Sequence, residues 1–299
     1  MRIGVGLPST IKQVSGSTVL DWARFADDGP LGSVGVLDQL RYDSLDPLAT
    51  LAAAAAVTTR LRLATTVVIG PLRNTPLLAK EAASIDQLSG GRLTLGLALG
   101  ARRDDYETAG VDYAHRGQRL TEQLVALRDI WEDHAIGPRP IQPRGPELIV
   151  GGSDDSAFAR VARYADGYMH GGGPPRAFAS AVSKARAAWV DAGRPGEPQL
   201  WGMAYFALGE RQAAEGRDYL LDYYAFTGPF AERIAGALLT TPQSIVQFAR
   251  AYAEAGCHHL VLFPTSADID QLHRLTETIA TKPPVPPREG GQGGSGRAR

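Results

Sequence analysis

The stretch from Pro76 to Gly100, PLLAKEAASIDQLSGGRLTLGLALG, decides the fold. Residues 77–88 have the apolar spacing and the length of a helix, and the sequence SGGR at 89–92 is typical of a turn that ends one. Residues 93–99 form a short apolar run, as in a strand that is buried on both faces, and Gly100 ends it. A helix that is followed at once by a buried strand is one repeat of a parallel α/β fold.

The same alternation continues along the chain. Strands are predicted at 2–7, 33–37, 61–69, 93–99, 147–150, 167–170, 199–208 and 259–263. Helices are predicted at 18–27, 47–58, 77–88, 119–133, 155–164, 175–192, 215–236, 242–255 and 269–281. Eight strands that alternate with helices in 299 residues predict a (β/α)8 TIM-type barrel, and a doubly wound open sheet is the alternative. We expect residues 1–282 to form a single barrel domain and the Pro- and Gly-rich residues 283–299 to form a disordered tail.

Composition excludes several classes of protein. The formal net charge is -1, with acidic and basic residues interspersed, which argues against a nucleic-acid partner. Residues 1–10 lack the basic start and the long apolar core of a signal peptide, and no apolar run has transmembrane length. Cys257 is the only cysteine, and the histidines show no metal-ligand spacing. We therefore expect a cytoplasmic protein with no membrane partner and no metal site.

In a barrel of this type the active site lies at the carboxyl ends of the strands. That rule selects the candidate segments 7–8, 38–39, 65–68, 98–102, 151–156, 170–172, 205–206 and 264–266. Four barrel or nucleotide chemistries are not supported by them. Gly4 and Gly6 precede Pro8 rather than a helix, so they form no dinucleotide fingerprint. The chain has neither a P-loop nor a G-x-S-x-G elbow, and its four lysines lie outside the predicted strand ends, which argues against a Schiff-base aldolase.

The best anion site among these segments is GGSDDS at 151–156. Two glycines allow the backbone to approach a ligand closely, and two serines can present hydroxyl groups at the start of the next helix. The start of a helix offers free N–H groups and a partial positive charge, which suits a phosphate. The alternative is that Ser153 caps the helix and the glycines only form the turn. Asp154 and Asp155 oppose an anion unless they face away from it.

Four segments together resemble the luciferase-like monooxygenase family, the (β/α)8 oxidoreductases that use reduced flavin or the deazaflavin F420. They are RIGVGLP at 2–8, the segment 77–100 with its LSGGRL core, the helix 119–131, which is similar to the family's E-x-L-x-x-L-R-x-x-W helix, and the segment 148–168, which is similar to its GG-S…A…A-x-x-A-D-G segment. The resemblance extends to about residue 280. The combination is specific, whereas any one segment alone is weak.

The resemblance implies a set of cofactor contacts. The phosphate would be held at Gly151, Gly152, Ser153 and Ser156, the isoalloxazine ring would lie along Thr65, Thr66 and Val67, the ribityl chain would pass Leu99 and Gly100, and Gly171 is a further expected contact. Asp38 and Gln39 would face the reactive edge of the ring.

Three residues are catalytic candidates. Asp38 is expected to act as an acid or base or to bind the substrate, and its alternative role is to cap the following loop. Gln39 occupies the position of a histidine in bacterial luciferases, so a light-emitting reaction is not implied. His170 titrates near neutrality and is a candidate proton donor, although hydrogen bonding to a phosphate or a loop is the preferred interpretation. The aromatic run at 219–230 either roofs a substrate pocket or packs in a helical core or a dimer.

The function that the resemblance implies is a monooxygenase that uses reduced FMN and O2 on a small organic substrate, with a separate flavin reductase as supplier. The first alternative is an F420H2-dependent hydride-transfer oxidoreductase. The second is a barrel that binds flavin without catalysis. Family members are usually homodimers, so a homodimer is expected.

Overall fold

The computed structural model describes residues 1–134 and 136–281, so the expected tail at 283–299 lies outside the described residues. The strands are β1 (Arg2–Gly6), β2 (Ser33–Val36), β3 (Arg62–Thr65), β4 (Val68–Ile69), β5 (Leu93–Ala98), β6 (Glu147–Gly151), β7 (Gly167–His170), β8 (Gln199–Phe206) and β9 (His259–Pro264). The α-helices are α1 (Gly16–Asp28), α2 (Pro47–Val57), α3 (Thr75–Ser89), α4 (Arg103–Ala109), α5 (Arg116–Glu132), α6 (Asp155–Tyr164), α7 (Pro175–Asp191), α8 (Glu210–Tyr223), α9 (Phe230–Ala235), α10 (Pro242–Glu254) and α11 (Ile269–Thr281). Two short 3-10 helices complete them, η1 (Gly70–Leu72) and η2 (Ala225–Thr227).

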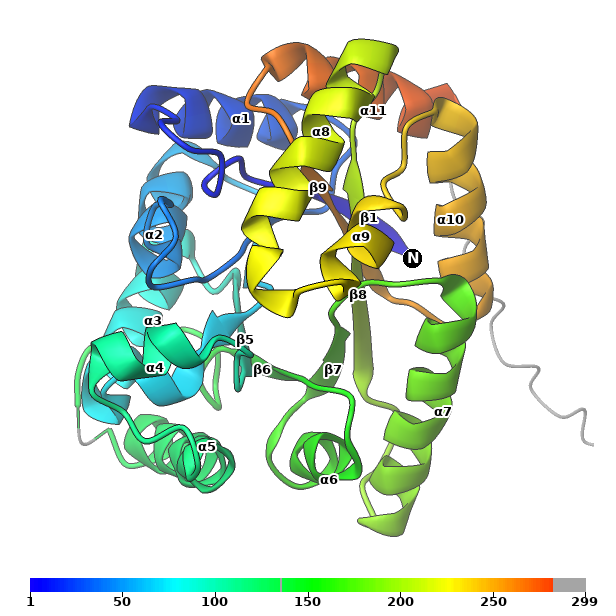
Figure 1. The fold of residues 1–299 in the computed structure, drawn as a ribbon. Helices are drawn as coiled ribbons and strands as arrows, with labels where there is room; N and C mark the ends of the chain where they lie inside the picture. Colours follow the sequence, from blue (N-terminus) through cyan, green and yellow to red (C-terminus); the bar gives the residue numbers. More distant parts are fainter. Residues whose placement is uncertain (135, 282–299) are drawn as a thin grey trace, which may run out of the picture.

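All strand pairs are parallel, and the sheet closes on itself (Figure 1). The strand order is β3-β2-β1-β9-β8-β7-β6-β5-β4, and an additional pairing of β3 with β5 completes the circle. β3 and β4 follow one another in the chain and both pair with β5. The two therefore occupy one position of an eight-position barrel. The structure therefore confirms the (β/α)8 prediction and excludes the open-sheet alternative.

Apolar side chains fill both layers of the barrel. Helices and strands share one large core, and a second cluster inside the barrel includes Ala64, Ile149, Met169, Trp201 and Val261. Each of these five is buried, which is what parallel strands covered on both faces require. Among the described residues, no helix is both long and apolar enough to cross a membrane.

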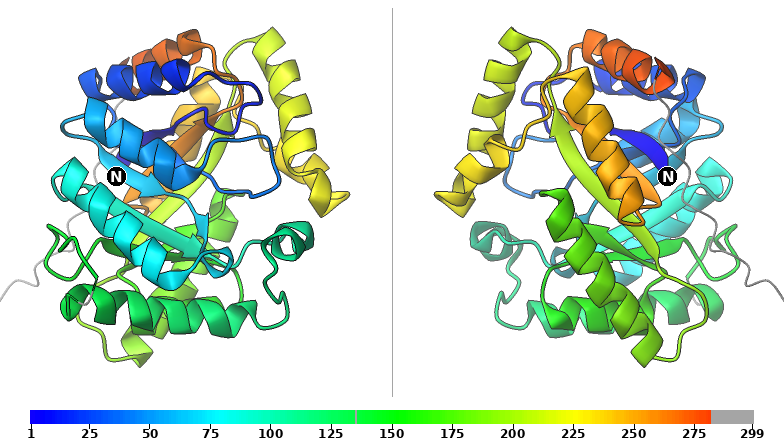
Figure 2. Two further views of the ribbon diagram at one scale, coloured as in Figure 1. Left: turned by 90° about the vertical axis from the view of Figure 1, so that its left-hand side faces the viewer. Right: turned by 90° about the vertical axis from the view of Figure 1, so that its right-hand side faces the viewer.

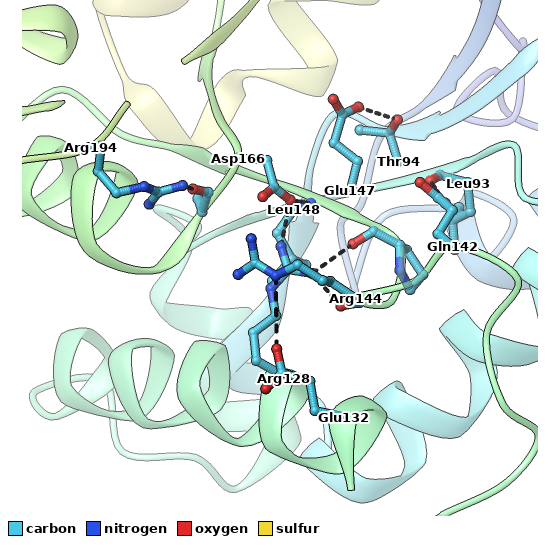
Figure 3. A network of polar contacts seen from close by, with 12 residues as sticks. Leu93, Thr94, Arg128, Glu132, Gln142, Arg144, Glu147, Leu148, Asp166 and Arg194 are labelled. Atoms are coloured by element: carbon cyan, nitrogen blue, oxygen red, sulfur yellow. Dashed lines mark hydrogen bonds and ion pairs between the residues drawn. The ribbon is translucent and has the colours of Figure 1, made fainter. Parts of the chain in front are cut away.

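The turn at 89–92, within the stretch 76–100, has a structural role at the amino end of the barrel. Gly90 ends α3 in a left-handed conformation, with φ at 70°. The guanidinium group of Arg92 then donates to the carbonyl groups of Leu61 at 2.7 Å and Thr58 at 2.8 Å, at the start of β3. A second arginine acts similarly nearby: Arg128 on α5 binds the Asp166 carboxylate and the carbonyl of Arg144 (Figure 3). Both arginines donate to backbone carbonyl groups outside the strands.

Three predicted elements differ from the structure. The predicted helix at 215–236 is wrong as one piece, because Gly228, with φ at 59°, and Pro229 separate α8 from α9. The predicted strand at 61–69 is interrupted between β3 and β4. The connection between the predicted strand at 93–99 and the predicted helix at 119–133 contains a further helix, α4, whose C-cap Gly110 has φ at 65°. The other predicted strands and helices are confirmed to within a few residues.

We expect Arg92→Ala to lower the free energy of unfolding by about 3 kcal/mol, because it removes charge-assisted hydrogen bonds to partly buried carbonyl groups. Urea unfolding at neutral pH measures this change. Arg24→Ala is the control, since Arg24 is exposed and pairs only with Asp21 on its own helix, and a change within about 0.5 kcal/mol is expected there. Equal effects of the two changes would contradict the assigned role of Arg92.

Candidate functional site

The carboxyl ends of the strands meet at one end of the barrel, and α4 and α8 lie at that same end. Both views in Figure 2 place the two helices there, apart from the ring of outer helices. The segments that the sequence selected lie at or just after the carboxyl ends of β1 to β9, so the fold brings them to one mouth. Their hydrogen bonds show which side chains are already bonded within the protein and which remain free for a ligand.

The loop Gly151–Ser156 joins β6 to α6 and leaves its backbone donors free. The N–H groups of Ser153 to Ser156 donate no hydrogen bond within the described part of the chain. Asp154, not Ser153, caps α6, and its carboxylate accepts from Ala157 N at 2.7 Å. Hydrogen bonds from Ser156 and Ala157 lower the pKa of Asp154. Ser153 is exposed, and its hydroxyl makes no hydrogen bond within the described part of the chain, so it stays free for a ligand.

The Ser156 hydroxyl, unlike that of Ser153, is hydrogen-bonded within the protein. Its hydroxyl donates to Asp154 at 2.8 Å and accepts from Arg160 at 3.2 Å. The Arg160 guanidinium thus stands one hydroxyl away from the capping carboxylate and offsets part of its negative charge. The sequence assigned Ser153 and Ser156 the same role, but in the structure only the Ser153 hydroxyl is free for a ligand.

His170 ends β7 beside this loop. Its Nδ1 lies 3.2 Å from the Tyr168 hydroxyl, which itself donates to the carbonyl of Gly152 at 2.9 Å. Its Nε2 is buried and has no partner in the described structure. Burial lowers the pKa of His170, so the neutral ring dominates at neutral pH. Gly171 follows, and a Cβ added there would meet nothing within 4 Å, which leaves room for a ligand.

The β3–β4 segment carries three predicted contacts, of which one faces the mouth. The Thr65 hydroxyl is fully buried, donates to Gly96 O at 2.8 Å and accepts from Gly96 N at 2.7 Å. The Thr66 hydroxyl donates to Val36 O at 3.1 Å. Val67 is partly exposed and lies near Gly151, where an added Cβ would come within 3.6 Å of it. Only Val67 therefore offers its side chain to a ligand.

Leu99 and Gly100 follow β5. Leu99 is half-buried and its carbonyl accepts a hydrogen bond from the Tyr106 hydroxyl of α4. Gly100 has φ at 68°, and a Cβ there would lie 2.8 Å from Ile69, so only glycine fits. These two residues turn the chain from the barrel into α4.

Asp38 follows β2 and is held from two sides. Its carboxylate accepts from Ile69 N at 3.0 Å and lies 3.4 Å from the Arg73 guanidinium. Arg73 binds Asp46 more closely, at 2.8 Å. Burial raises the pKa of Asp38 despite the opposing effect of Arg73. A buried carboxyl with a raised pKa is the kind of group that clusters at functional sites.

Gln39 is held by α4. Its side-chain oxygen accepts from Arg102 at 3.0 Å, and Arg102 also binds Asp104 at 2.6 Å. Hydrogen bonding to Asp104 raises the pKa of Arg102 and keeps it charged. Arg102 thus reaches the position beside Gln39 from the loop after β5.

Helix α8 covers part of the mouth and is held by polar contacts with loops of the amino half. Tyr219 binds Thr10 at 2.7 Å, and Asp222 accepts from Tyr42 at 2.6 Å and from Lys12 at 2.8 Å. Tyr219, Tyr223 and Tyr224 pack on the cluster inside the barrel, whereas Phe226 and Phe230 are exposed. The aromatic run therefore forms a roof at the mouth over its first half only.

One phenol of this roof meets a phenol of the barrel. The hydroxyls of Tyr205, at the end of β8, and Tyr224 lie 2.9 Å apart. Burial raises the pKa of Tyr224 to about 12 and that of Tyr205 still further, so both stay protonated at neutral pH. The mouth therefore combines an apolar, aromatic interior with few polar groups, as small-molecule sites do.

Sequence reasoning missed the residues that hold these candidates in place. They are Thr10, Tyr42, Tyr168 and Asp222, together with Asp104 and Asp105 of α4. One local signal was available for α4: two aspartates at its first turn and Gly110 at its end are typical helix boundaries. The other residues act through pairs that are far apart in sequence, such as Tyr42 and Asp222, for which the sequence carries no local signal.

A closed parallel barrel with polar loops and an aromatic roof at the carboxyl ends of its strands is the architecture of the barrel enzymes. The chain belongs to the luciferase-like monooxygenase family, whose model matches residues 1–262. The family that four sequence segments indicated is thereby confirmed.

Similarity to curated proteins covers part of the chain. Pyrimidine monooxygenase RutA of Cronobacter sakazakii is 32% identical over 176 residues, which are 50% of this chain and 50% of that protein. The first curated relatives, uncharacterized mycobacterial proteins, are matched over 64% or 54% of their length. The chain thus spans less than two thirds of the curated relatives that it matches first.

Solved structures show the same fold over almost the whole chain. An F420-dependent secondary alcohol dehydrogenase, in complex with an F420-acetone adduct, has a TM-score of 0.77 at 17% identity and covers 93% of this chain and 98% of its own. The oxygenating constituent of 3,6-diketocamphane monooxygenase of Pseudomonas putida, in complex with FMN, has a TM-score of 0.75 at 15% identity and covers 96% and 99%.

We expect Asp38→Asn to leave the free energy of unfolding at pH 7 unchanged or slightly higher. The raised pKa means that the folded protein binds a proton at Asp38 more tightly than the unfolded chain does, so this stabilisation is lost as the pH rises from about 4 through the folded pKa. Denaturant unfolding of both proteins from pH 4 to pH 7 measures the effect.

Asp27 is the matched control. Burial alone would raise its pKa, but hydrogen bonds from Thr59, Arg60 and Leu61 outweigh that effect and lower it. Its stabilisation is present at neutral pH and is lost as the pH falls through the lowered pKa. Asp27→Asn should therefore cost about 1–2 kcal/mol at pH 7. A similar loss for Asp38→Asn would show that Asp38 is an ordinary structural ion-pair residue.

Proposed function

We propose that the protein is a flavin-dependent monooxygenase that uses reduced FMN and O2 on a small organic substrate. The observation that carries the proposal is the row of free N–H groups from Ser153 to Ser156 at the start of α6, beside the partly exposed Val67 and the open position at Gly171. A phosphate fits the free N–H groups, and a flat apolar ring fits the space beside Val67 and Gly171. The names of RutA and of the FMN-bound camphane monooxygenase support the same activity.

In this proposal each part of the mouth has one task. Ser153 and the α6 N–H groups bind the phosphate, with Gly151 and Gly152 allowing close approach. Val67 supports one face of the ring, and the side chains under α8 exclude water from the substrate. The bound reduced cofactor would supply the electrons for the reaction with oxygen. Asp38 is the group that could hold or move a proton, since its raised pKa brings it closer to neutrality.

An F420H2-dependent hydride transfer is the second candidate, and the F420-dependent alcohol dehydrogenase supports it. The acidic tail of F420 favours free basic residues at the mouth. Arg73 is bound to Asp46 and Arg102 to Asp104, so these two arginines are already paired. This pairing favours FMN. A barrel that binds flavin without catalysis is the third candidate, and the raised pKa of the buried Asp38 favours an enzyme instead.

The same proposal includes a cytoplasmic homodimer that receives its flavin from a separate reductase. A groove of 360 Å³ lies between α2 and α3, with the apolar side chains of Leu48, Ala52 and Ile85 in it. Leu88 borders the groove and is 63% exposed. A second copy of the chain would cover these side chains.

Titration with FMN, reduced FMN under anaerobic conditions, and F420 tests the proposal. We expect reduced FMN to bind, because its phosphate fits α6 and its ring fits the mouth at Val67. Intrinsic fluorescence or calorimetry measures the affinity. Binding of F420 with no affinity for either flavin would overturn the monooxygenase proposal, and no binding of any of the three would overturn both enzyme candidates.

We expect Ser153→Ala to weaken FMN binding about tenfold, because a hydrogen bond to a charged phosphate contributes on the order of 1.5 kcal/mol. Ser156→Ala is the matched control one turn away. Its hydroxyl is used by Asp154 and Arg160, so a change within about threefold is expected, without a ligand hydrogen bond to lose. Calorimetry on the two variants gives the comparison, and equal losses would show that the structure assigns the serines wrongly.

A further inference from the structure

One buried polar atom at the mouth has no role in the contacts described so far. It is Nε2 of His170, which has no hydrogen-bond partner in the described structure. A Cβ added at Gly173 would lie 3.8 Å from this nitrogen, so the atom is directed at the glycine loop 171–173 that follows β7. A buried polar atom without a partner costs free energy, and such an atom at a ligand site calls for an explanation.

The hydrogen bonds behind the ring determine which proton Nε2 carries. The Tyr168 hydroxyl has one hydrogen, and the Gly152 carbonyl at 2.9 Å can only accept it. The Tyr168 oxygen must therefore accept from His170 at 3.2 Å, which requires a proton on Nδ1. In the neutral ring the other nitrogen then has none. The chain of bonds thus makes Nε2 a hydrogen-bond acceptor.

The surroundings keep the ring neutral. Phe178 packs edge-on against it at 5.6 Å. The neighbouring titratable groups are Tyr168, on the same strand β7, and Tyr252, on α10. Burial raises the pKa of Tyr168 to about 12 and that of Tyr252 further, so neither is charged near neutral pH. Asp154 and Arg160 of α6 lie farther along the loop and bind each other through Ser156. Burial is the one cause that lowers the pKa of His170.

We propose that His170 accepts, through Nε2, a hydrogen bond from a hydroxyl group of the cofactor's polyol chain, and that Tyr168 is the positioning residue that fixes the required tautomer. This inference rests on the proposed flavin site. It assigns two adjacent subsites to the ends of β6 and β7: N–H donors at Ser153–Ser156 for an anion, and a neutral lone pair at His170 for a hydroxyl. A phosphate is excluded from the His170 subsite, because the lone pair of the unprotonated Nε2 repels phosphate oxygens.

Three flavins separate the two subsites. FMN has both the phosphate and the polyol, riboflavin has the polyol alone, and lumiflavin has neither. The loss of one neutral hydrogen bond corresponds to an affinity change of about threefold to tenfold. We expect His170→Asn to weaken riboflavin and FMN by that factor and to leave lumiflavin unchanged, because Asn retains a donor to Tyr168 but does not reach the ligand. His170→Gln places an amide oxygen near the position of Nε2 and should restore most of the riboflavin affinity.

The pH dependence of riboflavin binding has opposite signs for the two possible roles of His170. Riboflavin carries no phosphate, so its own charge is constant in this range. If Nε2 accepts, affinity falls as the pH drops below the lowered pKa of His170, which is under about 6.5, because protonation turns the acceptor into a donor. His170→Gln should abolish this fall in affinity. Any pH dependence of riboflavin binding that remains in this variant is assigned to Asp38. An affinity that rises on acidification would overturn the proposal.

Nitrogen NMR of histidine-labelled protein tests the tautomer without any ligand. The His170 signals, assigned by their loss in His170→Gln, should show a proton on Nδ1 and none on Nε2. Tyr168→Phe should introduce the second tautomer, because it removes the hydroxyl that accepts from Nδ1. A proton on Nε2 in the unchanged protein would overturn the proposal.

The failure of this inference is distinguishable from the failure of the proposed function. If the unchanged protein binds none of the three flavins, the proposed function is wrong and the inference falls with it. If it binds riboflavin and His170→Asn binds it equally well, the inference alone is wrong. If His170→Asn weakens lumiflavin as much as riboflavin, the contact is to the ring and the assignment to the polyol is wrong. Retained lumiflavin affinity also shows that the variant is folded.

Discussion

The closure of the barrel between β3–β4 and β5 is the constraint on which the site depends. Ala64 pairs with Thr94 and Val68 pairs with Leu97, so one extra residue is accommodated on the β3–β4 side, as in a bulge. There the backbone ladder is interrupted, and the Thr65 side chain bridges to both backbone groups of Gly96 in its place. The same irregularity leaves Val67 partly exposed at the mouth. The bond that closes the barrel thus also shapes the proposed ring site.

The mouth is organised by side chains that bind loops to one another, because no ladder extends past the strand ends. Arg73 joins the loop after β2 to η1, Arg102 joins it to α4, and Asp222 joins α8 to the amino half. Arg73 and Arg102 are partly buried, whereas the Asp222 contacts are exposed. Nε2 of His170 has no hydrogen-bond partner among the described residues, and the pKa of Asp38 stays raised although Ile69 and Arg73 donate to it. Both groups lie at strand ends, where a ligand can reach them.

Local pattern predicted most of the fold, since the alternation of short apolar strands with amphipathic helices depends on neighbours in sequence. It failed where tertiary contacts override local preference. The run 215–236 has helical spacing throughout, but its second part turns back at Gly228 and Pro229 so that α9 packs near η2. For the site, the rule of strand ends selected the right positions, but it could not distinguish Thr65, whose hydroxyl is consumed inside the barrel, from Val67, which faces the mouth.

The sequence by itself determined the barrel class, the family and the segments that reach the mouth, because periodicity and turn residues act over a few residues. Only the tertiary structure decided what each candidate can do. It separated Ser153 from Ser156 through Asp154 and Arg160, and it fixed the tautomer of His170 through Tyr168 and Gly152. The reason is physical: whether a hydroxyl or a ring nitrogen is free depends on partners that the closed barrel brings within hydrogen-bond distance, and these are not encoded in local spacing.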